Sequence, residues 1–116
     1  MNFISFLYDR EPRYGISYKG AITDLTNKVL EAKTLKELIL KNGISKAKKF
    51  ASNNPGTIDI DKVELLPVIP DPGKIICVGL NYSEHVKETG RTVEQNPVIF
   101  LRVPESQTAH KQSIQR

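Results

Sequence analysis

The sequence is poor in the features that mark disulfide-bonded, secreted or membrane-spanning proteins. It has a single cysteine, which excludes an internal disulfide and agrees with a reducing compartment. No apolar run approaches the ~20 residues needed to span a bilayer. The N-terminus also lacks the basic and then apolar layout of a signal peptide. We therefore expect a cytoplasmic protein that does not insert into membranes.

The composition is that of an ordinary globular protein. Of its 116 residues, 39% are hydrophobic and 26% are charged, which suits one complete domain but not two. The net charge of +4 comes mainly from lysines that are opposed only by Glu37. These are Lys33, Lys36, Lys41, Lys46, Lys48 and Lys49. The stretch offers Phe50 and no arginine, so we interpret it as a solvated face and expect no nucleic-acid partner.

The first 66 residues have the pattern of a small α+β domain. Alternating apolar residues predict strands at 2–8, 14–19 and 21–25, with a further extended stretch over 58–66. Thr34 and Glu37 have the spacing of a capping box and predict a short helix, which Asn42-Gly43 ends. Ser45 begins a second helix that runs through Ala51. The prolines of residues 67–73 then predict a linker before a second part, residues 74–116.

Two apolar runs in the second part predict strands. Residues 74–78 are short, apolar and largely β-branched, and Gly79 closes them, which favours a strand buried on both faces. Pro97 precedes a second apolar run, residues 98–102, which ends at Arg102. Cys77 lies inside the first run, so we expect a buried structural thiol and not a nucleophile.

A polar helix is predicted between these strands, over residues 82–89. Asn81 suits its N-cap and Gly90 its C-terminal end. His85 and Glu88 are then neighbours on one helical face. An imidazole oriented by a carboxylate can take up and release a proton near neutral pH. From spacing alone, however, a weak solvated pair worth ~0.2–0.5 kcal/mol is favoured over a catalytic dyad.

The pattern G-x-N-Y-x-x-H-x-x-E-x-G, followed by P-V-x-F-L-R, resembles the opening of the catalytic domain of the fumarylacetoacetate hydrolase family. The close resemblance covers roughly the last third of the chain. Residues 21–26, with the leucine-rich helix after them, are more loosely similar to the small N-terminal domain of many members. The resemblance implies a mostly β catalytic domain that this chain contains only at its beginning, as an opening strand, helix and strand.

The resemblance also implies an activity and a set of site residues. The complete protein would be a divalent-metal-dependent enzyme for small oxo-acids, acting by C–C bond hydrolysis, decarboxylation or keto-enol isomerisation, and a homodimer. His85 and Glu88 would be the catalytic pair. Arg102 would hold a substrate carboxylate, and Tyr82 and His110 would line the same cavity. Without the family, Arg102 is a surface arginine at a strand end, Tyr82 packs against a strand, and His110 is exposed.

Metal binding is where the chain departs from the family pattern. Members hold Mg²⁺ or Mn²⁺ through an E-x-E pair and a later aspartate, which are hard oxygen ligands. The later carboxylates of this chain lack that spacing. We therefore assign no metal ligand and expect no cofactor in this chain alone. The alternative to an enzyme is that the chain is a catalytically silent N-terminal folding or assembly module, or a fragment.

Overall fold

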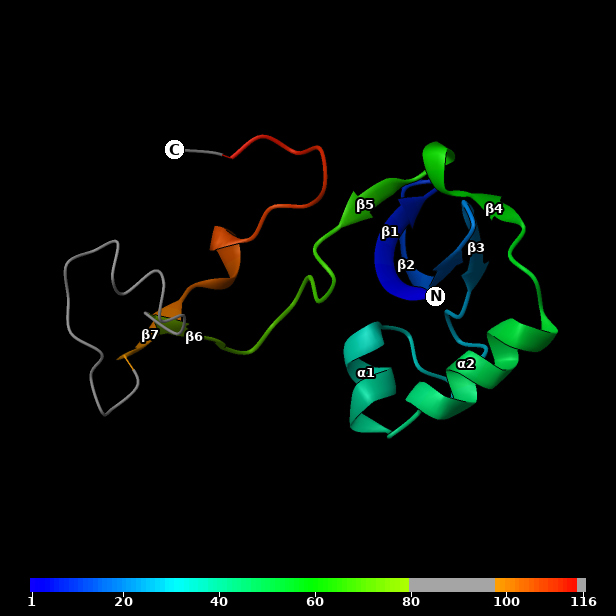
Figure 1. Ribbon diagram of the computed structural model, residues 1–116, viewed down its shortest axis with the longest axis horizontal. Helices are drawn as coiled ribbons and strands as arrows, with labels where there is room; N and C mark the ends of the chain where they lie inside the picture. The colour runs from blue at the N-terminus through cyan, green and yellow to red at the C-terminus, as the bar shows by residue number, and fades with distance from the viewer. Residues whose placement is uncertain (80–97, 115–116) are drawn as a thin grey trace. The chain divides into compact units, whose positions relative to one another are not determined.

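The computed structural model describes residues 1–79 and 98–114. It divides into two compact units, Met1–Asp71 with Thr108–Arg116, and Pro72–Gln107. The first is a mixed α+β unit with a curled antiparallel sheet and two helices (Figure 1), as the sequence predicts. Among the described residues, no helix is both long and apolar enough to cross a membrane.

Three consecutive strands form an antiparallel meander at the centre of the first unit. They are β1 (Asn2–Tyr8), β2 (Glu11–Tyr18) and β3 (Ala21–Asp24). Both connections are two-residue turns with positive φ at both positions, which matches the right-handed twist of paired strands. The turn at Lys19-Gly20 has the expected glycine. The turn at Asp9-Arg10 has no such signal and was not predicted.

The start of β2 differs from the prediction by three residues. We expected this strand to begin at Tyr14, but it begins at Glu11 and includes Pro12. Pro12 is tolerated because β3 pairs only with the second half of β2, from Gly15 to Tyr18. The missing N–H of Pro12 therefore interrupts no ladder on that side.

Two short strands complete the sheet at its edges. They are β4 (Ile58–Asp59) and β5 (Glu64–Leu66), and the sheet order is β4-β3-β2-β1-β5. The expected extended stretch is interrupted by a 3₁₀ turn, η1 (Ile60–Lys62). The curl of the sheet brings its two edges close enough for this short turn to connect them (Figure 1).

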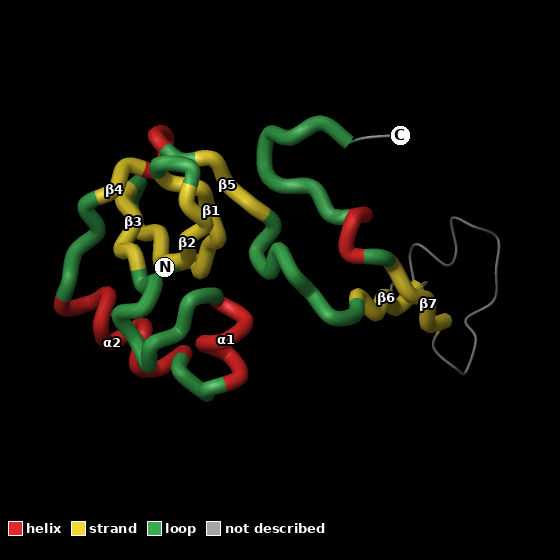
Figure 2. The backbone as a smooth tube through the Cα atoms, turned by 180° about the vertical axis from the view of Figure 1, so that it is seen from behind, coloured by secondary structure: helices red, strands yellow, loops and turns green. Residues whose placement is uncertain are grey.

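The two helices are α1 (Leu35–Leu40) and α2 (Ile44–Asn53), and they lie together beside the curled sheet (Figure 2). The Thr34 hydroxyl accepts a hydrogen bond from the backbone N–H of Glu37 at 3.1 Å, as the capping-box spacing predicts. The Glu37 carboxylate accepts from the N–H of Lys33, one residue before the cap. α1 begins directly after Thr34, and α2 begins one residue before the predicted Ser45. Both helices thus begin within one residue of their predicted starts.

The core of this unit lies between one face of the sheet and the helices. Tyr14, Ile16 and Leu25 contribute from the sheet side and are almost fully buried. The helices contribute Leu35, Leu38, Ala47 and Ala51. Alanines on the inner face of α2 let that helix approach closely, because their side chains add little volume.

The proline-rich segment is attached to the first unit up to Asp71. The Ser5 hydroxyl donates to the carbonyl oxygen of Val68 at 2.8 Å, and Ile69 packs against the core. The Lys36 ammonium donates to the carbonyl oxygen of Asp71 at 2.7 Å and pairs with its carboxylate at 3.1 Å. The division into residues 1–66, a linker 67–73 and residues 74–116 stays a prediction.

The second unit is built on a two-stranded antiparallel ribbon, β6 (Ile75–Gly79) and β7 (Val98–Arg102), followed by a 3₁₀ turn, η2 (Pro104–Ser106). β7 has the predicted bounds, and β6 begins and ends one residue later than the predicted 74–78. The expectation that β6 is buried on both faces was wrong, because its residues alternate between half-buried and exposed. Cys77 is accordingly half-buried. All five residues of β7 are exposed.

Candidate functional site

Three of the five predicted site residues lie outside the described residues. Tyr82, His85 and Glu88 all belong to residues 80–97. The helix over 82–89 and the pairing of His85 with Glu88 therefore stay predictions. The described residues do place the two strands that flank this segment, because Gly79 pairs with Val98 in the ribbon.

Arg102 lies at the end of β7, opposite Ile75 in the ribbon register. Its side chain is exposed, and its Nη2 donates to the carbonyl oxygen of Ser106 at 2.6 Å. The turn of η2 thus holds the guanidinium in place. A guanidinium has five N–H donors, so this bond leaves donors for a second acceptor such as a carboxylate.

His110 belongs to a turn in the first unit. The backbone N–H of Gln112 donates to the carbonyl oxygen of Ala109 at 3.2 Å, and the N–H of Ala109 donates to the Gln112 side chain at 3.1 Å. The Gln112 amide nitrogen donates in turn to the Glu64 carboxylate at 3.1 Å, which attaches the turn to β5. Arg102 belongs to the other unit.

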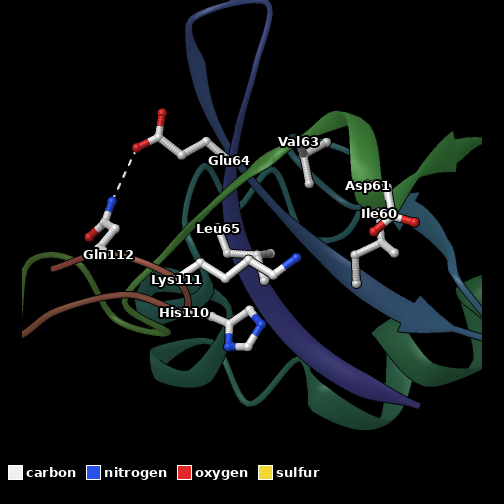
Figure 3. A pocket seen from close by; sticks show the side chains of 8 residues that line it. All are labelled: Ile60, Asp61, Val63, Glu64, Leu65, His110, Lys111 and Gln112. Atoms are coloured by element: carbon white, nitrogen blue, oxygen red, sulfur yellow. Dashed lines mark hydrogen bonds between the residues drawn. The ribbon is translucent and has the colours of Figure 1, made fainter.

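The turn and β5 border a cavity of about 550 Å³ in the first unit (Figure 3). Its polar lining consists of His110, Lys111, Gln112, Asp61 and Glu64, and its apolar lining of Ile60, Val63 and Leu65. Hydrogen-bond donors and acceptors are both present, so the cavity suits a small polar molecule. The sequence did not indicate Asp61 and Glu64 as lining residues. The hydrogen bond between Gln112 and Glu64 joins segments 48 residues apart, and no local sequence pattern predicts it.

A buried ionic cluster lies around Asp24, at the end of β3. Its carboxylate pairs with the guanidinium of Arg13 at 3.0 Å and the ammonium of Lys28 at 3.6 Å, and accepts from the N–H of Thr26 at 2.9 Å. Burial favours a raised pKa, but the hydrogen bonds from Thr26 and Arg13 and the charge of Lys28 lower the pKa of Asp24 below its ordinary value of 3.8. The carboxylate is satisfied by protein groups, so we interpret the cluster as structural.

Tyr14 is buried on the opposite face of the sheet, toward the helices. Burial, together with the negative charges of Asp24 and Glu37, raises the pKa of Tyr14 to about 12. Within the described part of the chain, its hydroxyl oxygen has no hydrogen-bond partner. The protein thus disfavours the phenolate form of Tyr14.

The described residues do not assemble a metal site. Across residues 1–79 and 98–114, no three histidine, cysteine, aspartate or glutamate side chains gather closely enough to hold an ion. We assign no metal ligand to this chain and derive no chemical step through a metal.

Comparison with known proteins gives three informative matches. The rat mitochondrial oxaloacetate tautomerase Fahd2a is 31% identical over 101 residues, which is 83% of this chain and 32% of the rat protein. The Arabidopsis thaliana mitochondrial oxaloacetate tautomerase FAHD1 is 59% identical over 29 residues, 25% of this chain and 13% of that protein. A solved fumarylacetoacetate hydrolase from Exiguobacterium antarcticum matches 90% of this chain and 36% of its own, with a TM-score of 0.55 and 25% identity.

No protein-family model matches the chain. The chain spans about a third of the rat relative and of the Exiguobacterium structure. The rat and Exiguobacterium matches thus extend over most of this chain but only over part of each relative.

Proposed function

Because this chain is homologous to part of the proteins of the fumarylacetoacetate hydrolase family, we propose that it forms part of a divalent-metal-dependent enzyme that acts on small oxo-acids. The observation that supports this most is the rat match, which extends over 83% of the chain. The structural match to a fumarylacetoacetate hydrolase, over 90% of the chain, supports the same family by fold.

Among the possible reactions, we favour keto-enol isomerisation over C–C bond hydrolysis and decarboxylation. Several relatives, from rat, Arabidopsis and Escherichia coli, are named oxaloacetate tautomerases. All three reactions act on an enolisable carbonyl, and the relatives' names give the acid. The substrate we propose is therefore oxaloacetate or a 2-oxo-acid of similar size.

His85 and Glu88 are the pair that we propose moves the proton. Tautomerisation removes a proton from the carbon beside the carbonyl and returns one to oxygen, or the reverse. An imidazole whose basicity is supported by a carboxylate is suited to both steps near neutral pH. The proposal rests on the family pattern G-x-N-Y-x-x-H-x-x-E-x-G, which both residues match.

Arg102, Tyr82 and His110 are the residues that we propose bind substrate. The exposed guanidinium of Arg102 is fixed by Ser106 and retains free donors, so it can hold a carboxylate through two parallel hydrogen bonds. We propose substrate contacts for Tyr82 and His110 as well. For His110, the support is its place on the lining of the cavity beside Glu64.

The metal and its ligands belong to the complete protein. Mg²⁺ or Mn²⁺ would polarise the substrate carbonyl and stabilise the enolate. We also propose that this chain is catalytically silent when alone, because it spans only about a third of the rat relative. Within the complete protein it would supply the proton-transfer pair and the arginine.

The test is a chimera in which this chain replaces the matched region of rat Fahd2a. We expect the chimera to accelerate the enol-to-keto conversion of oxaloacetate, followed by the loss of enol absorbance, in the presence of Mg²⁺ or Mn²⁺. The isolated chain should leave the spontaneous rate unchanged. A folded chimera without activity, or activity of the isolated chain after metal removal by a chelator, would contradict the proposal.

A further inference from the structure

Arg102 is the last residue of β7, and the η2 turn that follows it determines where its guanidinium lies. The Nη2 of Arg102 donates to the carbonyl oxygen of Ser106 at 2.6 Å, four residues along the chain. An exposed arginine without such a partner samples many rotamers, because its side chain is long and flexible. The bond to Ser106 therefore orders a guanidinium that would otherwise move freely in water.

Ser106 closes the turn that presents this carbonyl oxygen. Its backbone N–H donates to the carbonyl oxygen of Val103 at 3.0 Å, and its hydroxyl donates to the same oxygen at 2.6 Å. Pro104, at the start of η2, restricts the backbone further because its ring fixes φ. The N–H of Gln107 donates to the carbonyl oxygen of Pro104 at 3.1 Å. The Ser106 hydroxyl thus helps to hold in place the residue whose carbonyl oxygen binds Arg102.

The acceptor that orders the guanidinium is neutral, so the positive charge of Arg102 stays uncompensated. Glu105 is exposed and lies three residues from Arg102 in the sequence. Even so, none of the ion pairs between residues that the structure describes involves Arg102. A carboxylate partner would use the donors and the charge that a substrate acid needs, whereas a carbonyl oxygen directs the guanidinium without neutralising it. The arrangement therefore suits the binding of a carboxylate from outside the turn.

We propose that Ser106 is a positioning residue for Arg102 and prepares its guanidinium to bind the carboxylate of the oxo-acid substrate. Ordering a flexible side chain during binding weakens affinity by about 2- to 10-fold. A guanidinium that is already ordered in the free protein avoids this loss. The inference rests on the proposed function, because the substrate carboxylate is taken from it.

The first test measures the guanidinium itself in the isolated chain. A hydrogen bond from Nη2 slows the rotation of a guanidinium about its Nε–Cζ bond, and NMR of the arginine side-chain nitrogens measures that rotation. Ser106→Ala removes the hydroxyl and should speed the rotation at Arg102 at least about twofold. Ser106→Thr should restore the slow rotation, because a threonine hydroxyl can donate to a carbonyl oxygen three residues earlier.

The matched control is Ser52→Ala in the first unit. The Ser52 hydroxyl also donates to a backbone carbonyl oxygen, that of Lys48 at 3.0 Å, but it belongs to α2 and not to η2. The variant therefore removes a hydrogen bond of the same kind elsewhere in the chain. It should leave the rotation at Arg102 unchanged.

The second test measures turnover of oxaloacetate by the rat chimera with the same variants. A contact between Arg102 and the substrate carboxylate contributes equally to binding in the ground state and in the transition state, because the carboxylate does not react. Ser106→Ala should therefore raise KM about 2- to 10-fold and change kcat by less than about twofold. Ser106→Thr and Ser52→Ala should keep the KM of the unmodified chimera, and Arg102→Ala should raise KM at least as much as Ser106→Ala.

Two results would overturn the inference. One is a rotation at Arg102 that Ser106→Ala leaves unchanged, and the other is a KM that Ser106→Ala leaves unchanged although Arg102→Ala raises it. Failure of the proposed function gives a different pattern, namely an unchanged KM for Arg102→Ala or a folded chimera without turnover. The NMR measurement does not depend on turnover, so it still decides whether Ser106 positions the guanidinium.

Discussion

Replacing Asp24 by asparagine removes the charge on which a buried ionic cluster depends, and we expect it to destabilise the first unit measurably. The Asp24 carboxylate is nearly buried, with 7% of the side chain exposed, and pairs with Arg13 at 3.0 Å and Lys28 at 3.6 Å. Asparagine is nearly the same size and keeps an oxygen for the N–H of Thr26. The substitution therefore tests the charge more than the packing.

The magnitude follows from the exposure of the partners. Removing one partner of a fully buried ion pair costs about 3–5 kcal/mol, because the other charge is left without compensation. The side chains of Arg13 and Lys28 are 34% and 51% exposed, so water replaces part of what they lose. We expect the free energy of unfolding to fall by about 1–3 kcal/mol at pH 7.

The same cluster gives the variant a distinct pH dependence. The pKa of Asp24 is lower in the folded state than its ordinary value of 3.8, so its stabilising contribution is complete above that value. The contribution disappears as the pH falls through the lowered folded pKa. The gap in stability between the wild type and Asp24→Asn should therefore narrow below pH 3.8.

Urea unfolding followed by far-ultraviolet circular dichroism, at pH 7 and at pH values around and below 3.8, measures both effects. Asp71→Asn is the matched control, because Asp71 pairs with Lys36 at 3.1 Å but both side chains are substantially exposed. It should change stability by less than about 1 kcal/mol. If Asp24→Asn behaves like Asp71→Asn at pH 7, or if its deficit is unchanged in acid, the cluster does not have the role we assign to it.

Three further predictions concern the core, the sheet and metal binding. Tyr14→Phe removes a buried hydroxyl without a partner in the described chain, so it should cost less than about 1 kcal/mol at pH 7. Because the folded pKa of Tyr14 is raised to about 12, the wild type should lose more stability than Tyr14→Phe as the pH rises from 10 to 12, and identical alkaline unfolding of both proteins would contradict this. Gly15→Ala would place a Cβ against the carbonyl oxygen of Thr23, too close for an ordinary contact, and should cost about 1–3 kcal/mol in urea unfolding. Gly73→Ala, where a Cβ would meet nothing within 4 Å, should be neutral, and equal stability of the two variants would count against the sheet geometry. The isolated chain should bind Mn²⁺ no better than millimolar, and micromolar binding by calorimetry would reveal a site that we have missed.

Local signals account for most of what the sequence predicted correctly. The helix at Thr34 follows from a hydroxyl and an acid three residues apart, and the structure shows the expected hydroxyl bond to the N–H of Glu37. The limits of β1 agree fully with the alternating pattern over residues 2–8. In both cases the residues that determine the structure lie within a few positions of each other.

The features that were missed depend on distant partners. The turn at Asp9-Arg10 has no glycine or asparagine, so no residue in it indicates two consecutive positive φ angles. The attachment of the turn at Gln112 to Glu64 joins segments 48 residues apart. The apolar residues of β6 predicted burial, but burial requires a covering element, and a strand's own sequence does not supply one.

We propose that His85 moves the proton in an oxo-acid tautomerase, and one measurement decides whether it does. It is the turnover of oxaloacetate by the rat chimera with His85→Ala, compared with the unmodified chimera at the same metal concentration. We predict a fall in turnover of ~10²–10⁴-fold, the usual contribution of general acid–base catalysis, with a folded protein of unchanged Tm. Unchanged turnover would show that His85 does not transfer the proton, and the proposed catalytic pair would then be wrong.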